Sequence, residues 1–335
     1  NGNTLTVSNV KSATTCTVTY KQMLASDYLI TRVNMDGLVR INQPSTVQTP
    51  ELVEYRYSGS NDVVKNYVNF NNERWRIIGV FEVDDGTGTY ENRLKIIREE
   101  SIGKYSWDTS NSSINYGDGI NQWGAVTNYT GADLMKLLNP GYESLAANNS
   151  LYWNNQSGKC YNEAKNANIS CDFTSIGLKN DAKEMIEDAK WYNGSINENV
   201  LTNTAYKEER SNNIPTIAIV GTSIKQTTSW IGKVAIPYLS DYGYASKDCY
   251  LNTTLYNYNL SKCTDSNWLF NNEVYWTLGA ESELPRGNYR VDNTGEIGSF
   301  LTHGGYGVRP AVYLKTNVKI TSGTGTSSNP YQLSL

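Results

Sequence analysis

Short apolar segments with β character, each followed by a polar loop, set the strongest limit on the fold of this 335-residue chain. Three of them, at 66–70, 74–81 and 93–98, are separated by turns rich in Asn, Asp and Gly, which predicts an antiparallel meander. A shorter strand is expected before them, at 53–57. Further apolar runs stand in long polar loops at 214–220, 230–236, 274–278 and 307–314. The pattern therefore predicts many short strands among long, ordered loops.

Two segments have the spacing of an amphipathic helix. The first follows a capping-box pattern at 130–133, places three leucines on one face and ends at Asn139. The second has apolar residues at i, i+3, i+4 and i+7 after Asn180, with Gly194 as its expected C-terminal cap. Both apolar faces are expected to pack into the core. Together with the strands, they predict an α+β domain with two helices and antiparallel sheets.

The N-terminal residues 1–22 contain two alternating runs and predict a β-hairpin, like the last two strands of an immunoglobulin-like repeat. The predicted organisation is this β segment, a connector at 23–52, a main domain at 53–320 and a C-terminal tail at 321–335. An isolated hairpin is marginally stable in water, so it either packs on its own domain or pairs with a neighbouring copy. Pairing between copies would make the chain a structural subunit of an extracellular fibre or pilus.

The cysteines indicate an oxidising environment. Cys160 and Cys171 flank one short polar segment, and Cys249 and Cys263 flank another, so their proximity predicts two disulfides within the domain. Each closes a small loop and is expected to contribute about 3 kcal/mol to stability. Cys16 is not expected to pair with any of these four. Disulfides of this kind favour a secreted or cell-surface location, with any export signal or anchor outside this sequence.

Several classes of function find little support in the sequence. The chain has one histidine and no C-x₂-C spacing, which argues against a zinc site. Common phosphate-binding loops are missing from the sequence. A net charge of −4 without a basic run argues against nucleic acid, and the lack of an apolar stretch of about 18 residues argues against membrane insertion. The acidic turns at 84–88 and 116–119 lack the spacing of a calcium loop, so we expect no metal or cofactor.

The segments at 69–79, 95–98, 240–245, 275–277 and 307–314 together resemble an uncharacterised domain of Gram-positive bacterial surface proteins. That domain is similar to the C-type-lectin-like fold of formylglycine-generating enzymes and of the variable proteins made by diversity-generating retroelements. The resemblance covers residues 53–320, and the strands with Trp-Thr and Gly-Val-Arg-Pro are its most specific part. It implies a C-type-lectin-like domain, in which Trp276 and Arg309 are expected to be structural.

The resemblance also suggests which activity to expect. The enzymes of this superfamily hold copper with a late cysteine pair, and this chain has no cysteine after Cys263, so the oxidase activity is not implied. In the retroelement-diversified proteins, the ligand surface lies between the strands that match 275–277 and 307–314. The matching loop here is 279–306. Its candidate ligand-binding residues are charged or aromatic: Glu281, Glu283, Arg286, Tyr289, Arg290, Asp292, His303 and Tyr306.

Two functions from different classes follow. The first is a non-enzymatic binding or adhesion domain, secreted or displayed on a cell surface, whose partner is an unknown glycan or surface protein. The 25 tyrosines, 8 tryptophans and 40 asparagines suit such a contact surface. The second is an enzyme, either a degenerate relative of the formylglycine-generating enzymes or a glycoside hydrolase. In that case Glu281, Glu283 and Asp292 would act near His303, with carboxylates about 5–10 Å apart across a cleft.

Overall fold

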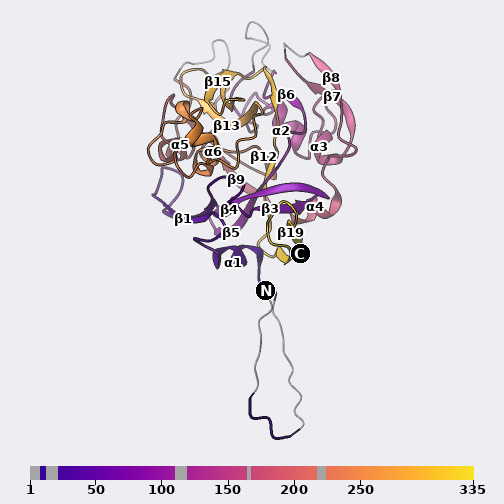
Figure 1. Cartoon of the computed structure of the whole chain (residues 1–335). Helices are drawn as coiled ribbons and strands as arrows, with labels where there is room; N and C mark the ends of the chain where they lie inside the picture. The colour runs from indigo at the N-terminus through magenta and orange to yellow at the C-terminus, as the bar shows by residue number, and fades with distance from the viewer. Residues whose placement is uncertain (1–7, 13–21, 110–118, 164–166, 217–223) are drawn as a thin grey trace.

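The computed structural model describes residues 8–12, 22–109, 119–163, 167–216 and 224–335 (Figure 1). The predicted N-terminal hairpin lies almost entirely outside the described residues, as do Cys16, Asp118 and most of the apolar run at 214–220. These expectations therefore stay predictions.

The predicted meander forms the middle of the larger sheet. β3 (Tyr67–Phe70), β4 (Glu73–Asp84) and β5 (Tyr90–Arg98) pair antiparallel in that order, as expected. β4 is long enough to pair with β3 along the first part of one edge and with β2 (Leu52–Tyr57) along the second part. A long β4 therefore organises the whole sheet.

Close approach of β2 to β4 depends on Gly79. A Cβ atom at this position would lie 2.1 Å from the carbonyl oxygen of Tyr55 on β2, which no side chain tolerates. The pairing of β4 with β5 also shifts register between Ile77 and Gly79. A bulge of this kind increases the local twist of a sheet.

The sheet extends into segments that the sequence pattern assigned to a connector and a tail. β1 (Leu38–Gln43) pairs antiparallel with β2, and β19 (Tyr331–Ser334) pairs parallel with β3 and antiparallel with β18 (Lys319–Ser322). Residues 23–52 and 321–335 therefore belong to the same folded unit as the main domain. Strand pairing between chain ends is a long-range contact, which local patterns do not reveal.

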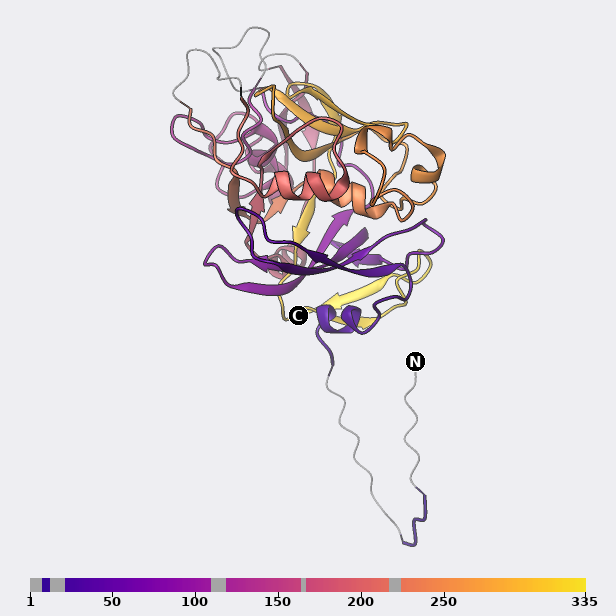
Figure 2. The same ribbon diagram turned by 90° about the vertical axis from the view of Figure 1, so that its left-hand side faces the viewer.

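Helices cover both faces of this sheet (Figure 2). On one face lies α1 (Ala25–Ile30), and on the other lie α5 (Thr202–Glu209) and α6 (Leu239–Ala245). The remaining edge is continued by β17 (Ala311–Tyr313) and β12 (Val234–Ala235). Among the described residues the sheet has nine strands. The large core includes buried tryptophans and tyrosines from both layers.

The second sheet replaces the loop expected at 279–306. Its strands, in order, are β15 (Ile297–Leu301), β14 (Gly287–Val291), β13 (Tyr275–Glu281), β16 (Gly305–Gly307) and β6 (Lys104–Ser106), and β10 (Ser195–Ile196) pairs with the end of β13. Most of the expected loop is therefore strand. Its glycines and charged residues conceal the alternation that usually signals a strand.

The first predicted helix is present as α2 (Asp133–Leu138), and all six of its residues are buried. Its predicted capping box does not form, because Ala132 is the N-cap residue and no side chain caps the helix. The Asp108 carboxylate instead accepts the backbone N–H of Asp133 at 3.2 Å, and the Trp107 carbonyl accepts that of Leu134 at 3.1 Å. Tertiary contact therefore takes the place of the local cap.

The second predicted helix is much shorter than expected. α4 (Asn180–Met185) ends before Ile186, which forms an isolated bridge to Leu314. The chain then enters β9 (Ala189–Tyr192), which pairs antiparallel with β11 (Ser229–Gly232). The expectation of a helix to Gly194 is therefore wrong. Apolar residues at helical spacing can also satisfy a turn followed by a strand.

The expectation of two helices is also wrong, since seven α-helices occur in the described parts of the chain. Those not yet given are α3 (Leu151–Asn154) and α7 (Ser261–Thr264), with the 3-10 helix η2 (Leu255–Asn257) before α7. Helices α3 and α7 are each one turn long. Helices this short carry too few apolar positions to produce a clear periodic signal.

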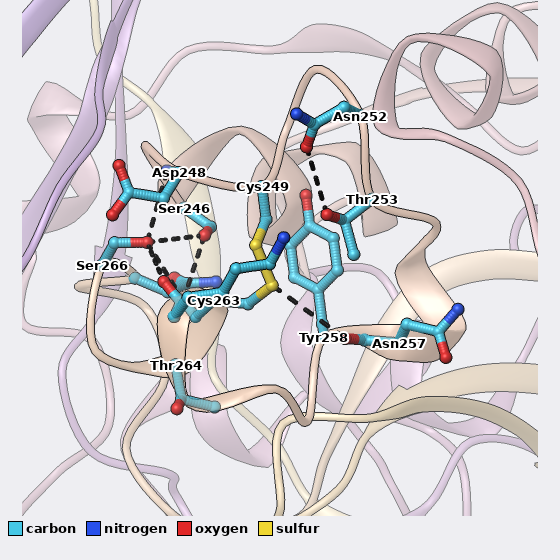
Figure 3. Close-up of a disulfide and its surroundings, with 12 residues drawn as sticks. Ser246, Asp248, Cys249, Asn252, Thr253, Asn257, Tyr258, Cys263, Thr264 and Ser266 are labelled. Atoms are coloured by element: carbon cyan, nitrogen blue, oxygen red, sulfur yellow. Dashed lines mark hydrogen bonds between the residues drawn. A yellow bond between two sulfur atoms is a disulfide. The ribbon is translucent and has the colours of Figure 1, made fainter.

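Both predicted disulfides are confirmed. Cys160–Cys171 joins β7 (Ser157–Tyr161) to β8 (Asn168–Asp172), with Cα atoms 5.9 Å apart. Cys249–Cys263 joins α7 to the turn after α6, with Cα atoms 5.4 Å apart (Figure 3). The two bridges are consistent with an extracellular protein.

Candidate functional site

A pocket of about 280 Å³ lies between the second sheet and the loop before α5. One wall is the segment 197–200, and a second wall contains Tyr289 of β14 and Ser299 of β15. Leu239 and Leu255 supply apolar surface. The pocket thus combines a few polar groups with apolar contacts, as small-ligand sites commonly do.

Helix α5 fixes the first wall of this pocket. The Glu208 carboxylate accepts hydrogen bonds from the backbone N–H and the side-chain amide of Asn197, at 2.8 and 2.7 Å. The amide oxygen of Asn197 accepts a third bond from the Ser282 hydroxyl, at 2.8 Å. These contacts hold Glu198 and Asn199 beside the pocket, since they follow Asn197 directly.

The second wall has an acidic character. Tyr289 is buried, and its hydroxyl donates to the Ile196 carbonyl at 3.3 Å. Burial raises the pKa of Tyr289, and the nearby carboxylates of Glu281 and Glu198 raise it further. Burial also raises the pKa of Glu281, whose carboxylate accepts a hydrogen bond from the Ser299 hydroxyl. The pocket therefore favours ligands that donate hydrogen bonds or carry positive charge.

Tyr256 on η2 brings an aromatic ring to the lining of the pocket, and the residue is 54% exposed. The backbone N–H of Leu255 donates to the Val200 carbonyl at 2.9 Å and ties η2 to the first wall. The Cys249–Cys263 disulfide closes the segment that carries η2, and Tyr258 lies against it (Figure 3). The bridge thus stabilises one side of the pocket.

The structure separates the residues expected to form the ligand surface. Tyr289 lines the pocket, and Glu281 contacts its wall through Ser299. Arg290 lies on the other face of β14, because successive side chains of a strand point in opposite directions. Its guanidinium lies 4.3 Å from the ring centroid of Tyr306. These candidate residues are therefore divided between the two faces of one sheet.

The face with Arg290 carries an aromatic and cationic cluster. The guanidinium lies 3.7 Å from the ring centroid of Phe300, which is exposed at the surface. Tyr306 packs edge-on against Phe300 and against the buried Trp276. Trp276 and Arg309 are both buried and donate to backbone carbonyls, in agreement with the expected structural roles.

The other four candidates do not line the pocket. Glu283 is exposed in the turn after β13, and the Arg286 carbonyl accepts the Thr302 N–H. The Asp292 carboxylate accepts hydrogen bonds within its own turn, from residues 294 and 296. The His303 carbonyl accepts the Ser106 hydroxyl at 2.7 Å. The proposed grouping of carboxylates around His303 in one cleft is therefore not what this pocket shows.

Sequence reasoning missed the residues from outside the expected loop. Asn197, Glu198 and Asn199 are 80 or more positions before the expected loop, and Tyr256 lies between them and that loop. The polar run at 197–199 and the tyrosine-rich segment near Cys249 are signals of exposed surface. Neither signal indicates that the two segments meet. The two segments meet through the isolated bridge between Leu201 and Thr254 and the hydrogen bond from the Leu255 N–H to the Val200 carbonyl, which are both long-range contacts.

The structure also bears on the acidic turn before β5, on metal sites and on membrane-spanning helices. The Asp84 carboxylate accepts the backbone N–H groups of Gly86 and Gly88, at 2.8 and 2.9 Å, and so supports the turn. Within the described residues, no group of three or more His, Cys, Asp or Glu residues could hold a metal ion. None of the helices in those residues is long and apolar enough to cross a membrane.

Comparison of the chain with protein-family models, with curated proteins and with solved structures finds no match. The structure itself shows a mixed α+β fold, rich in sheet with short helices. The C-type-lectin-like fold expected at 53–320 stays a prediction.

Proposed function

We propose that the chain is an extracellular, non-enzymatic binding domain, C-type-lectin-like in fold, that recognises the terminal sugar of a glycan in the pocket between 197–200 and β15. The observation that carries the proposal is the combination of an exposed Tyr256 ring with Asn, Glu and Ser side chains around about 280 Å³. An aromatic face packs on the apolar face of a sugar ring. Amide and carboxylate oxygens accept hydrogen bonds from its hydroxyls.

The charge of the pocket narrows the ligand class. Glu198 lines the pocket, and Glu281 and Glu208 hold its two walls. Several carboxylates in one small site repel an anionic ligand and attract a cationic one. The proposed ligands are therefore neutral or amino sugars, and sialylated or sulfated sugars are disfavoured.

A glycan array followed by titration with the best ligand tests this proposal. The Tyr256→Ala variant is expected to weaken binding about tenfold or more, since stacking area is lost. The matched control is Phe300→Ala, which removes an exposed ring from the opposite face of the same sheet and should leave affinity unchanged. Loss of binding in Phe300→Ala with retention in Tyr256→Ala would place the ligand on the face with Arg290 and Tyr306. Absence of binding to any glycan would contradict the proposal.

A second candidate function is glycoside hydrolysis in the same pocket. The raised pKa of Glu281, which contacts Ser299 of the pocket wall, suits a general acid, and the carboxyl group of Glu198 lines the pocket. Incubation of the bound glycan with the wild-type chain and with Glu281→Gln distinguishes the two functions. Release of sugar by the wild type alone would favour hydrolysis, and an unchanged glycan supports the binding domain.

A further inference from the structure

Lys95 and Asp241 form an ion pair in the centre of the molecule. The Lys95 Nζ atom lies 2.5 Å from the Asp241 Oδ2 atom, and both side chains are 0% exposed. Lys95 is on β5 in the larger sheet, and Asp241 is on α6, which covers that sheet. The contact therefore joins two layers across 146 positions of sequence.

Aromatic rings surround the lysine side chain. The distances from Nζ to the ring centroids of Tyr238, Trp191, Tyr313 and Phe81 are 4.0, 5.0, 5.3 and 5.8 Å. These rings exclude water, and burial lowers the pKa of Lys95 to about 8. The neutral amine, which is the nucleophilic form, is therefore a larger fraction of this lysine than of an exposed lysine at the same pH.

The other buried charges around Lys95 and Asp241 form complete ion pairs of their own. The buried ionic centre consists of Glu54, Arg56, Lys95, Glu209, Arg210 and Asp241. Within it, Arg56 pairs with Glu54 at 2.7 Å, and Arg210 pairs with Glu209 at 2.9 Å. Loss of one positive charge at Lys95 and one negative charge at Asp241 would leave two complete pairs. A condensation between these two side chains thus leaves no buried charged group without an opposite charge.

We propose that Lys95 and Asp241 condense to an intramolecular amide bond that links β5 covalently to α6. The reacting groups are already in contact, are shielded from water and lie in a strand of the sheet and in a helix that covers it (Figure 2). Water is the leaving group, so the reaction needs no oxidant or other co-reactant. It rests on observations independent of the sugar-binding proposal.

The step balances with atoms already in place. One proton passes from Lys95 Nζ to Asp241 Oδ2 along their hydrogen bond, and the nitrogen lone pair then adds to the Asp241 Cγ atom. Arg56 donates to Oδ1 at 2.9 Å and stabilises the negative charge that this oxygen gains. A second proton moves from nitrogen to Oδ2, the bond from Cγ to Oδ2 breaks, and water leaves. The product is an amide between Nζ and Cγ.

Mass spectrometry of the purified, reduced wild-type chain tests the proposal without a variant. The expected mass is lower than the sequence mass by one water molecule, and protease digestion should give a branched peptide that joins the Lys95 and Asp241 segments. The partly exposed pair Lys233 and Asp188, with Nζ and Oδ2 2.9 Å apart, is the internal control and should give linear peptides. The double variant Lys95→Met with Asp241→Leu should have its full sequence mass.

Two results would overturn the proposal. The first is a wild-type chain of full sequence mass with normal cleavage after Lys95. The second is a water loss that maps to a linear peptide, since an aspartate can also cyclise onto its own backbone. Neither result bears on glycan binding, so the two proposals fail separately.

Discussion

The buried ionic centre and the pocket beside 197–200 both hold carboxylates next to tyrosines, yet they differ in charge and in access to solvent. The centre has three positive and three negative side chains, and each one is buried. The pocket has Glu198, Glu281 and Glu208 around an opening with an exposed Tyr256. Positive and negative side chains are thus equal in number in the ionic centre, which excludes water, whereas carboxylates predominate around the pocket, which a ligand can enter.

The difference shows in the pKa of a carboxyl group from each region. Burial alone would raise the pKa of Asp241, but Lys95 and Arg56 hold it below its ordinary value. Burial raises the pKa of Glu281, and the carboxylates of Glu198 and Glu283 add to the increase. A closed, paired region therefore holds the layers together, whereas an open, unpaired region is suited to binding. The following predictions test that contrast.

The largest expected effect comes from leaving the ionic centre unbalanced. Asp241→Leu removes the partner of Lys95 and takes one acceptor from Arg56, so two buried cations lose compensation. We expect this single variant to be about 3–5 kcal/mol less stable than the double variant Lys95→Met with Asp241→Leu. Both variants lack any link between the two side chains, so urea unfolding isolates the cost of unpaired charge. Equal stability of the two would show that balance in this region is unimportant.

The matched control for this comparison is a partly exposed pair. Asp188→Leu removes the partner of Lys233, whose side chain remains in contact with solvent. Surface pairs contribute about 0–1 kcal/mol, so this variant should unfold close to the wild type. A loss as large as that of Asp241→Leu would contradict the role given to burial.

The two disulfides give the next largest effect and separate stability from binding. Replacement of both cysteines by serine in either pair is expected to cost about 2–4 kcal/mol, because the unfolded chain gains freedom. Cys249 and Cys263 close the segment that carries Tyr256, so their loss should also weaken glycan binding. Cys160 and Cys171 close the hairpin of β7 and β8. Their loss should leave binding unchanged in the same titration.

The local parts of the fold could be predicted from the sequence. The meander at 66–98 depends on alternation and turns within a few residues, and both disulfides join cysteines 11 and 14 positions apart. The helix expected after Asn180 ends early, because Ile186 forms an isolated bridge to Leu314 and Ala189 pairs in a strand. Sequence spacing alone cannot tell which of these contacts wins.

The candidate site was predictable only in part, for the same reason. Tyr289 and Glu281 lie in the segment that the resemblance indicated, and both belong to the pocket walls. The other wall comes from Glu198 and its neighbours, which reach the pocket through the parallel pairing of β10 with β13. The contact between Lys95 and Asp241 joins residues that are even further apart in the sequence, by 146 positions. Pairings of this length follow from the whole fold and have no local sequence signal.

The smallest expected effect is a pH dependence of stability that comes from the Glu281 carboxyl group. The raised pKa of Glu281 means that the native state keeps a proton after the unfolded state has lost it, above the ordinary value of 4.5. Stability from this group is therefore fully present below that value and is lost as the pH rises through the native pKa. Glu281→Gln does not titrate, so the stability of the wild type relative to this variant should fall as the pH rises from about 4 to about 8. Parallel unfolding curves for the two proteins over this range would show that the Glu281 carboxyl is not perturbed.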